Sequence, residues 1–137
     1  MIKLILGHKG SGKTKKLIAL VNEAMEASNG SVACVEKEAL LTTEISHKVR
    51  LIDTDSYGVE GYDQLLGFLC GVCAGNHDIT DLFVDATLKI GGKDYAKVGE
   101  FLTKVNGAVS SDVKVTFTVS ADKEELPAAI FDFCEVI

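Results

Sequence analysis

The 137-residue chain has no tryptophan, a single proline and a single arginine, and aromatic residues make up only 7% of it. It also has no apolar run near the roughly 20 residues that are needed to cross a bilayer. The opening apolar run is too short for a secretory signal and is interrupted by Lys3. No repeat, low-complexity segment or linker divides the sequence. These absences predict one cytoplasmic domain over residues 1–137, with no membrane-spanning segment.

A surplus of positive charge is also lacking. The formal net charge is −6 at pH 7, and no block of like charges resembles a nucleic-acid-binding arm. Binding of nucleic acid through overall charge is therefore not expected. In a cytoplasmic chain the four cysteines are expected to be reduced thiols; they are Cys34, Cys70, Cys73 and Cys134.

The sequence does contain a complete phosphate-binding loop. Residues 7–14 read Gly-His-Lys-Gly-Ser-Gly-Lys-Thr, which fits the pattern G-x-x-x-x-G-K-[ST]. An apolar run over 2–6 precedes the loop and a helix-forming stretch over 13–28 follows it, which is the context that the motif requires. Glycines let such a loop wrap its N–H groups around a phosphate, and the positive end of the following helix faces the same anion.

We expect this loop to bind a nucleotide through its phosphates. Lys13 would contact the β- and γ-phosphates, and Thr14 would offer its hydroxyl to Mg²⁺. The expected nucleotide-binding residues are Gly7, His8, Lys9, Gly10, Ser11, Gly12, Lys13, Thr14 and Lys15.

Apolar strands alternate with helical patterns along the rest of the chain. This alternation predicts an α/β fold of three layers (α/β/α), with a mostly parallel sheet of about five strands and helices on both faces. The expected strands are 2–6, 31–35, 49–52, 81–86 and 113–119, with a terminal strand over 133–137. The expected helices are 13–28, 36–46, 61–75 and 94–108, with a short one near Pro127.

Catalysis on a bound nucleotide also needs a carboxylate near Mg²⁺, at the end of a neighbouring apolar strand. Asp85, which closes the run Leu82-Phe83-Val84, fits this position best. Asp53, which follows the run 49–52, is the competing candidate. We therefore expect Thr14 and Asp85 at the metal, with Asp53 as the alternative.

Through residues 7–14 and 81–85 the chain resembles the P-loop NTPase superfamily. The resemblance implies ATP and Mg²⁺ as ligands and hydrolysis of the nucleoside triphosphate as the reaction, with Lys13 and Asp85 in catalytic roles. The overall sequence pattern of the chain also resembles small bacterial ATP-binding proteins, some of which carry a twitching-motility ATPase label. The pilus-retraction motors to which that label refers are far longer, and they carry acidic and histidine-containing sequence boxes that this chain lacks.

Two departures from the superfamily bear on turnover. In its large ATPase branch a glutamate follows the aspartate at the strand end and prepares the attacking water, whereas this chain has Ala86 there. Ser120, at the end of the predicted strand 113–119, could stand where that branch has a polar sensor residue. Arg50 is the sole arginine, although phosphoryl transfer commonly uses arginine to neutralise developing charge.

These departures predict a slow Mg²⁺-dependent ATPase. A small-molecule kinase is disfavoured because nucleotide kinases use several arginines. The alternative is a nucleotide-responsive interaction module with little turnover. A second copy of the chain or a protein partner is a candidate source of missing catalytic groups.

Two further patterns allow other interpretations. Residues 55–58 spell D-x-x-G, as in a GTPase, but the guanine-reading N/T-K-x-D is absent. Cys70 and Cys73 form a C-x-x-C, with His77 four residues later, but they fall inside an apolar helical stretch rather than at a helix start. We therefore favour ATP over GTP, and packing over metal or redox chemistry for the cysteines. Gly67, Gly71 and Gly75 predict close packing of that helix against the sheet or another subunit.

Overall fold

A computed structural model describes residues 2–137 as an α/β fold built on one six-stranded sheet. All strand pairs are parallel, in the order β3-β2-β4-β5-β1-β6. The strands are β1 (Ile2–Leu6), β2 (Ser31–Glu36), β3 (Arg50–Asp53), β4 (Ile79–Val84), β5 (Lys114–Val119) and β6 (Cys134–Val136). The predicted fold class is confirmed, with the terminal strand present as β6.

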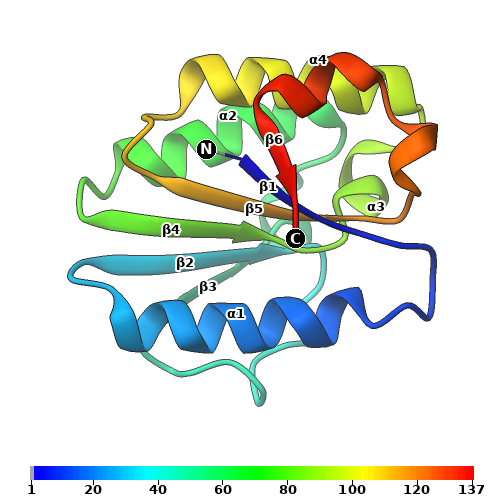
Figure 1. Ribbon diagram of the computed structural model, residues 1–137. Coiled ribbons are helices and arrows are strands. Elements are labelled where there is room, and N and C mark those ends of the chain that lie inside the picture. Colours follow the sequence, from blue (N-terminus) through cyan, green and yellow to red (C-terminus); the bar gives the residue numbers. More distant parts are fainter. Residues whose placement is uncertain (1) are drawn as a thin grey trace.

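Helices cover both faces of this sheet (Figure 1). The helix α1 (Lys13–Ala27) lies on one face, and α2 (Tyr62–Ala74), α3 (Thr87–Gly91) and α4 (Tyr95–Ala108) lie on the other. Because successive strand residues point to opposite faces, β2 serves both layers. Ala33 and Val35 pack in the core beneath α2 and α4, whereas Val32 and Cys34 pack beneath α1.

Three short 3₁₀ helices complete the chain. They are η1 (Asp55–Tyr57), η2 (Lys123–Glu125) and η3 (Ala128–Asp132). The element predicted near Pro127 is η3, so the short helix is present but in the tighter 3₁₀ form.

The predicted helix over 36–46 is wrong. Glu36 is the last residue of β2, and the chain from 37 to 49 is irregular. Leu41, Ile45 and Val49 are spaced like one face of a helix, and they do pack beneath α1. The Glu36 carboxylate accepts hydrogen bonds from the backbone N–H groups of Leu40 (2.8 Å) and Leu41 (3.2 Å), so this segment is held by a side chain rather than by a helical ladder.

The helix α3 was not predicted, because Gly91-Gly92 reads as a chain break. Its glycine is needed for a close approach: a Cβ on Gly91 would come within 2.1 Å of the Tyr62 ring. The Tyr62 hydroxyl donates to the carbonyl of Gly92 at 2.5 Å. A helix of five residues therefore fits between β4 and α4.

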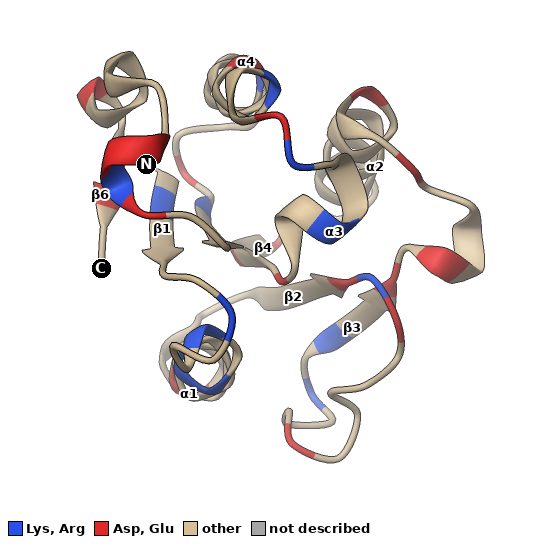
Figure 2. Ribbon diagram, turned by 90° about the vertical axis from the view of Figure 1, so that its right-hand side faces the viewer, with Lys and Arg blue, Asp and Glu red and all other residues tan. Residues whose placement is uncertain are grey.

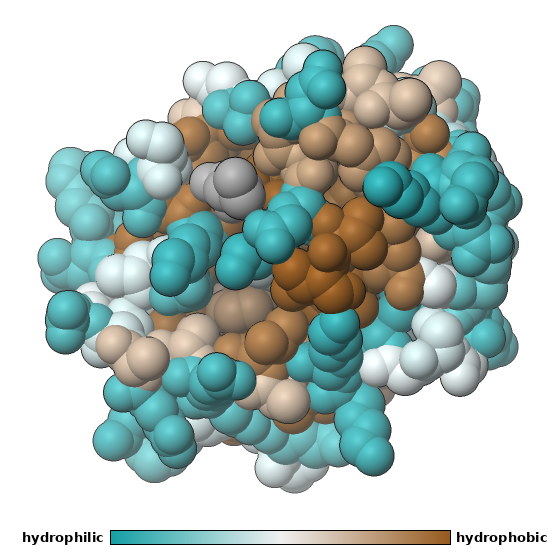
Figure 3. All heavy atoms as spheres, in the orientation of Figure 1, coloured by the Kyte–Doolittle hydropathy of each residue, from teal (hydrophilic) through white to brown (hydrophobic). Residues whose placement is uncertain are grey.

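Among residues 2–137, no helix is both long and apolar enough to span a bilayer. Figure 3 shows apolar side chains gathered in the part of the surface where Figure 1 places the C-terminus. Val136 of β6, the edge strand there, is 41% exposed.

Candidate functional site

The carboxyl ends of the parallel strands meet at one edge of the sheet, and the predicted site residues lie there. Figure 2 looks onto this edge, where the ends of β2 and β3 carry acidic residues and the start of α1 carries basic ones. The loop 7–14 joins β1 to α1 at the same edge. Ligands of open parallel sheets bind outside the carboxyl ends of the strands, so the arrangement concentrates the candidate groups where a ligand would lie.

The backbone of the loop depends on its glycines. Gly7, Gly10 and Gly12 have φ values of 140°, 87° and 84°, a region that other residues rarely adopt. A Cβ on Gly7 would come within 2.4 Å of the Ser11 hydroxyl, whereas one on Gly10 or Gly12 would meet nothing within 4 Å. Gly12 is also the N-cap of α1, and no side chain within residues 2–137 caps the start of that helix. The first N–H groups of α1 are therefore left for an anion.

Lys13 supplies a cation to this loop. Its ammonium donates to the backbone carbonyl of His8 at 3.2 Å. Partial burial lowers the pKa of Lys13, the nearby Asp85 carboxylate raises it, and Lys89 lowers it again. Because the net direction is downward, the cation is incompletely solvated and incompletely paired. A bound phosphate would stabilise its charged form.

Thr14 and Asp85 face each other across the sheet edge. The Thr14 hydroxyl lies 3.4 Å from both carboxylate oxygens of Asp85. Asp85 is held from the other side by Thr118 of β5, whose hydroxyl donates to its Oδ1 at 2.7 Å and accepts from the backbone N–H of Ala86 at 2.8 Å. A hydroxyl and a carboxylate offer the hard oxygen ligands that Mg²⁺ prefers, so the residues present fit that ion.

Asp53 is placed differently. Its carboxylate accepts from the N–H (2.9 Å) and the hydroxyl (2.6 Å) of Ser56, which closes the turn into η1. These hydrogen bonds lower the pKa of Asp53. The structure therefore brings Asp85, and not Asp53, together with Thr14.

Glu36 is a carboxylate of this edge that the sequence reasoning missed. Its side chain is 3% exposed, and Oε2 has no hydrogen-bond partner among the described residues. Burial raises the pKa of Glu36, its two backbone hydrogen bonds lower it, and Asp85 and Asp53 raise it further. A buried, half-satisfied carboxylate with a raised pKa is suited to proton transfer. The signal was available, because Glu36 directly follows the apolar run 31–35.

The other candidate residues take no part in the contact between Thr14 and Asp85. Ser120 follows β5, but the hydroxyl that reaches Asp85 belongs to Thr118. Arg50 is exposed at the start of β3, the opposite end of that strand from Asp53. Cys70 and Cys73 are half-buried within α2. Lys9 and Lys15 are exposed.

The His8 side chain turns toward η2. Its Nε2 lies 2.5 Å from Glu125 Oε1 and 3.5 Å from Asp122 Oδ2. The backbone of the loop contacts the same region, because the N–H of Gly7 donates to the carbonyl of Ala121 at 3.0 Å. These three contacts join the phosphate loop to the turn after β5 and to η2.

Comparison with known proteins bears on the fold. No family of sequences matches the chain, and no curated protein does. Among solved structures, the crystal structure of the flagellar accessory protein FlaH from Methanocaldococcus jannaschii is similar, with a TM-score of 0.58 and 13% sequence identity. The match covers 96% of this chain and 65% of FlaH. The fold is P-loop NTPase-like. This chain corresponds to about two-thirds of the FlaH chain, and the likeness concerns the fold alone.

Proposed function

We propose that the chain binds ATP together with Mg²⁺ at residues 7–14 and hydrolyses it slowly. The observation that carries the proposal is the position of Thr14 and Asp85, with 3.4 Å between the hydroxyl and either carboxylate oxygen, beside an uncapped helix start. The likeness to FlaH supports the fold on which this assignment depends.

Each group of the loop has a binding role in this proposal. The N–H groups of the loop and of the first turn of α1 surround the phosphates, and the Lys13 ammonium pairs with the β- and γ-phosphates. Thr14 and Asp85 would hold Mg²⁺, and Thr118 orients the Asp85 carboxylate. When bound there, the ion would supply positive charge against the charge that develops on the phosphate oxygens.

Glu36 is the group we assign to the attacking water. Its free Oε2 would accept the proton as the water oxygen attacks the γ-phosphorus and the bond to the bridging β–γ oxygen breaks, giving ADP and inorganic phosphate. Two features slow this step. The other oxygen of Glu36 is tied to the N–H groups of Leu40 and Leu41, and the sole arginine, Arg50, is at the far end of β3.

A nucleotide-responsive interaction module is the second candidate. It is favoured by Leu40, which is 71% exposed and belongs to the segment that holds the Glu36 carboxylate. In that case a partner bound at Leu40 would change the position of Glu36, and turnover would be incidental. A protein partner or a second copy of the chain could fill this role.

One experiment separates these functions. ATP and GTP are titrated into the protein by calorimetry with Mg²⁺ present, and phosphate release is followed on the same sample. We expect saturable ATP binding, weaker GTP binding and slow release of phosphate. Binding without release would favour the interaction module, and binding of neither nucleotide would refute both proposals.

A further inference from the structure

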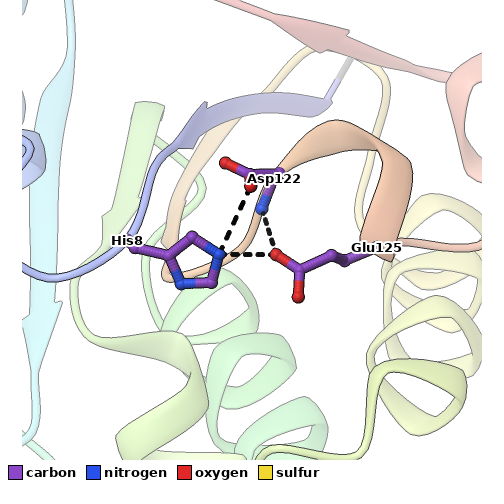
Figure 4. Close-up of side chains that lie close together, drawn as sticks. All are labelled: His8, Asp122 and Glu125. Atoms are coloured by element: carbon purple, nitrogen blue, oxygen red, sulfur yellow. Dashed lines mark hydrogen bonds and ion pairs between the residues drawn. The ribbon is translucent and has the colours of Figure 1, made fainter.

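We propose that His8, Asp122 and Glu125 form a binding site for one divalent transition-metal ion of the zinc class. Figure 4 shows the three side chains converging: His8 from the phosphate loop, Asp122 from the turn before η2, and Glu125 from η2 itself. This site is separate from the Thr14–Asp85 pair, and it includes an imidazole nitrogen that the other pair lacks.

The ligand atoms are already close to the spacing that a small ion needs. His8 Nε2, one oxygen of Asp122 and one oxygen of Glu125 all lie within 4.8 Å of one another. The imidazole nitrogen is 2.5 Å from the Glu125 oxygen and 3.5 Å from the Asp122 oxygen. Bonds to zinc of about 2.0–2.2 Å in tetrahedral geometry place ligand atoms roughly 3.4 Å apart. Side-chain adjustments of under about 1 Å would therefore bring these two contacts to zinc spacing.

The backbone holds the ligands in position before any ion binds. The N–H of Gly7, next to His8, donates to the carbonyl of Ala121, next to Asp122, at 3.0 Å. The N–H of Asp122 donates to Glu125 Oε1 at 2.9 Å, so two of the three ligand residues are joined directly. Such contacts reduce the cost of ordering ligands upon binding.

The cluster also has an unbalanced charge. Two carboxylates face a single imidazole, and the lysine of the same turn, Lys123, lies over the Phe131 ring at 5.0 Å from its centroid. A bound divalent cation would offset this excess of negative charge.

The donor types select the class of ion. Calcium and magnesium take oxygen ligands, whereas an imidazole with two carboxylates suits zinc and its first-row neighbours. The three side chains are 53%, 62% and 37% exposed, so solvent can reach the cluster and water can supply the remaining ligands. An ion bound here would fix residue 8 of the phosphate loop against the turn after β5.

The test measures zinc binding without nucleotide. Zn²⁺ is titrated by calorimetry into protein carrying Cys70→Ala and Cys73→Ala, which removes the two half-buried thiols of α2, with excess Mg²⁺ present to occupy the all-oxygen site. We expect one Zn²⁺ per chain with a dissociation constant near or below about 10 μM. His8→Asn and Glu125→Gln should each weaken binding at least about tenfold.

The variants are chosen so that folding does not confuse the result. Glu125→Gln keeps an oxygen that can accept from the N–H of Asp122, and His47→Asn is the matched control because His47 is exposed in the segment 37–49. Absence of zinc binding up to about 100 μM, or equal affinity in the parent and either ligand variant, would overturn the site. Since no nucleotide is present, this outcome is independent of the proposed ATP binding, on which only the consequence for the phosphate loop depends.

Discussion

At the scale of single residues, three carboxylates end three adjacent strands and meet three different environments. Asp85 after β4 is held by Thr118 and faces Thr14. Asp53 at the end of β3 accepts hydrogen bonds from Ser56 within a turn. Glu36 at the end of β2 is buried, and its Oε2 has no hydrogen-bond partner among the described residues. The three positions look alike in the sequence, since each follows a short apolar run. Only their partners distinguish them.

Replacing Lys13 tests the phosphate contact. Lys13→Ala should lower ATP affinity by about a hundredfold, because a charge-assisted contact of about 2–3 kcal/mol is lost. The fold should persist, since among residues 2–137 the side chain makes a single hydrogen bond, to the carbonyl of His8. Calorimetric titration measures the affinity, and circular dichroism checks the fold. Lys48→Ala, an exposed lysine in the segment 37–49, is the control; equal affinity in both variants would refute the site.

Asp85 and Asp53 can be separated by matched amides. Asp85→Asn should reduce the gain in ATP affinity that Mg²⁺ provides by about tenfold, because a charged ligand facing Thr14 is lost. Asp53→Asn should leave that gain unchanged, since an amide oxygen can still accept from Ser56. Titrations with and without Mg²⁺ measure the effect. The reverse result would assign the metal to Asp53.

Glu36 is tested by turnover rather than by affinity. Glu36→Gln should lower the rate of phosphate release by about a hundredfold or more, the usual contribution of a general base, while ATP affinity stays the same. Glu38→Gln, an exposed neighbour, should retain the rate of the parent. Phosphate release at saturating ATP is the measurement. An unchanged rate in Glu36→Gln would remove Glu36 from the reaction.

At the scale of elements, the errors of prediction have identifiable causes. The segment 37–49 has helical spacing of its apolar residues, but the Glu36 carboxylate takes two of its N–H groups. The sequence predicts that the glycines of α2 pack closely against the sheet or against another subunit. In the structure, a Cβ on Gly67 or Gly71 would meet nothing within 4 Å. Packing of these glycines against the sheet is therefore wrong, and contact with another subunit stays a prediction.

The start of α4 is set by a side chain. Asp94 Oδ1 accepts from the N–H groups of Ala96 (3.0 Å) and Lys97 (3.3 Å). Asp94→Ala should lower the free energy of unfolding by about 1 kcal/mol, the usual value of such a cap. Urea unfolding measures it, with Asp112→Ala, an exposed aspartate in a turn, as the control. An equal loss in both variants would show that the cap contributes nothing.

At the scale of the whole molecule, the strand order decides which groups can meet. The strand β5 lies between β1, which leads into the phosphate loop, and β4, which leads to Asp85. Thr14 therefore reaches Asp85 from α1, beneath the sheet edge, and β5 contributes Thr118 between them. The carboxyl edge of the sheet thus gathers residues that are far apart in the chain, such as Thr14 and Thr118, which are separated by 104 positions.

The stability of the fold should depend on pH through Glu36. Its pKa in the folded chain is raised above the ordinary 4.5, so its ionisation favours the unfolded chain. The stability that Glu36 contributes is complete below that ordinary value and is lost as the pH rises through the raised pKa. Glu36→Gln cannot ionise there, so the stability of this variant relative to the parent should increase as the pH rises above the ordinary value of 4.5 and through the raised pKa. Urea unfolding at several pH values measures it; a constant difference would contradict the raised pKa.

The sequence by itself determined the fold class, most of the strands and the glycine-rich turn over residues 7–14, because these depend on local patterns of apolar residues and glycines. It also placed Asp85 at a strand end. The tertiary structure decided which strand-end carboxylate faces Thr14, brought Thr118 to Asp85, left Glu36 half-satisfied, and joined His8 to η2. These contacts link residues far apart in the chain, and they depend on the order of strands in the sheet, which no local pattern specifies.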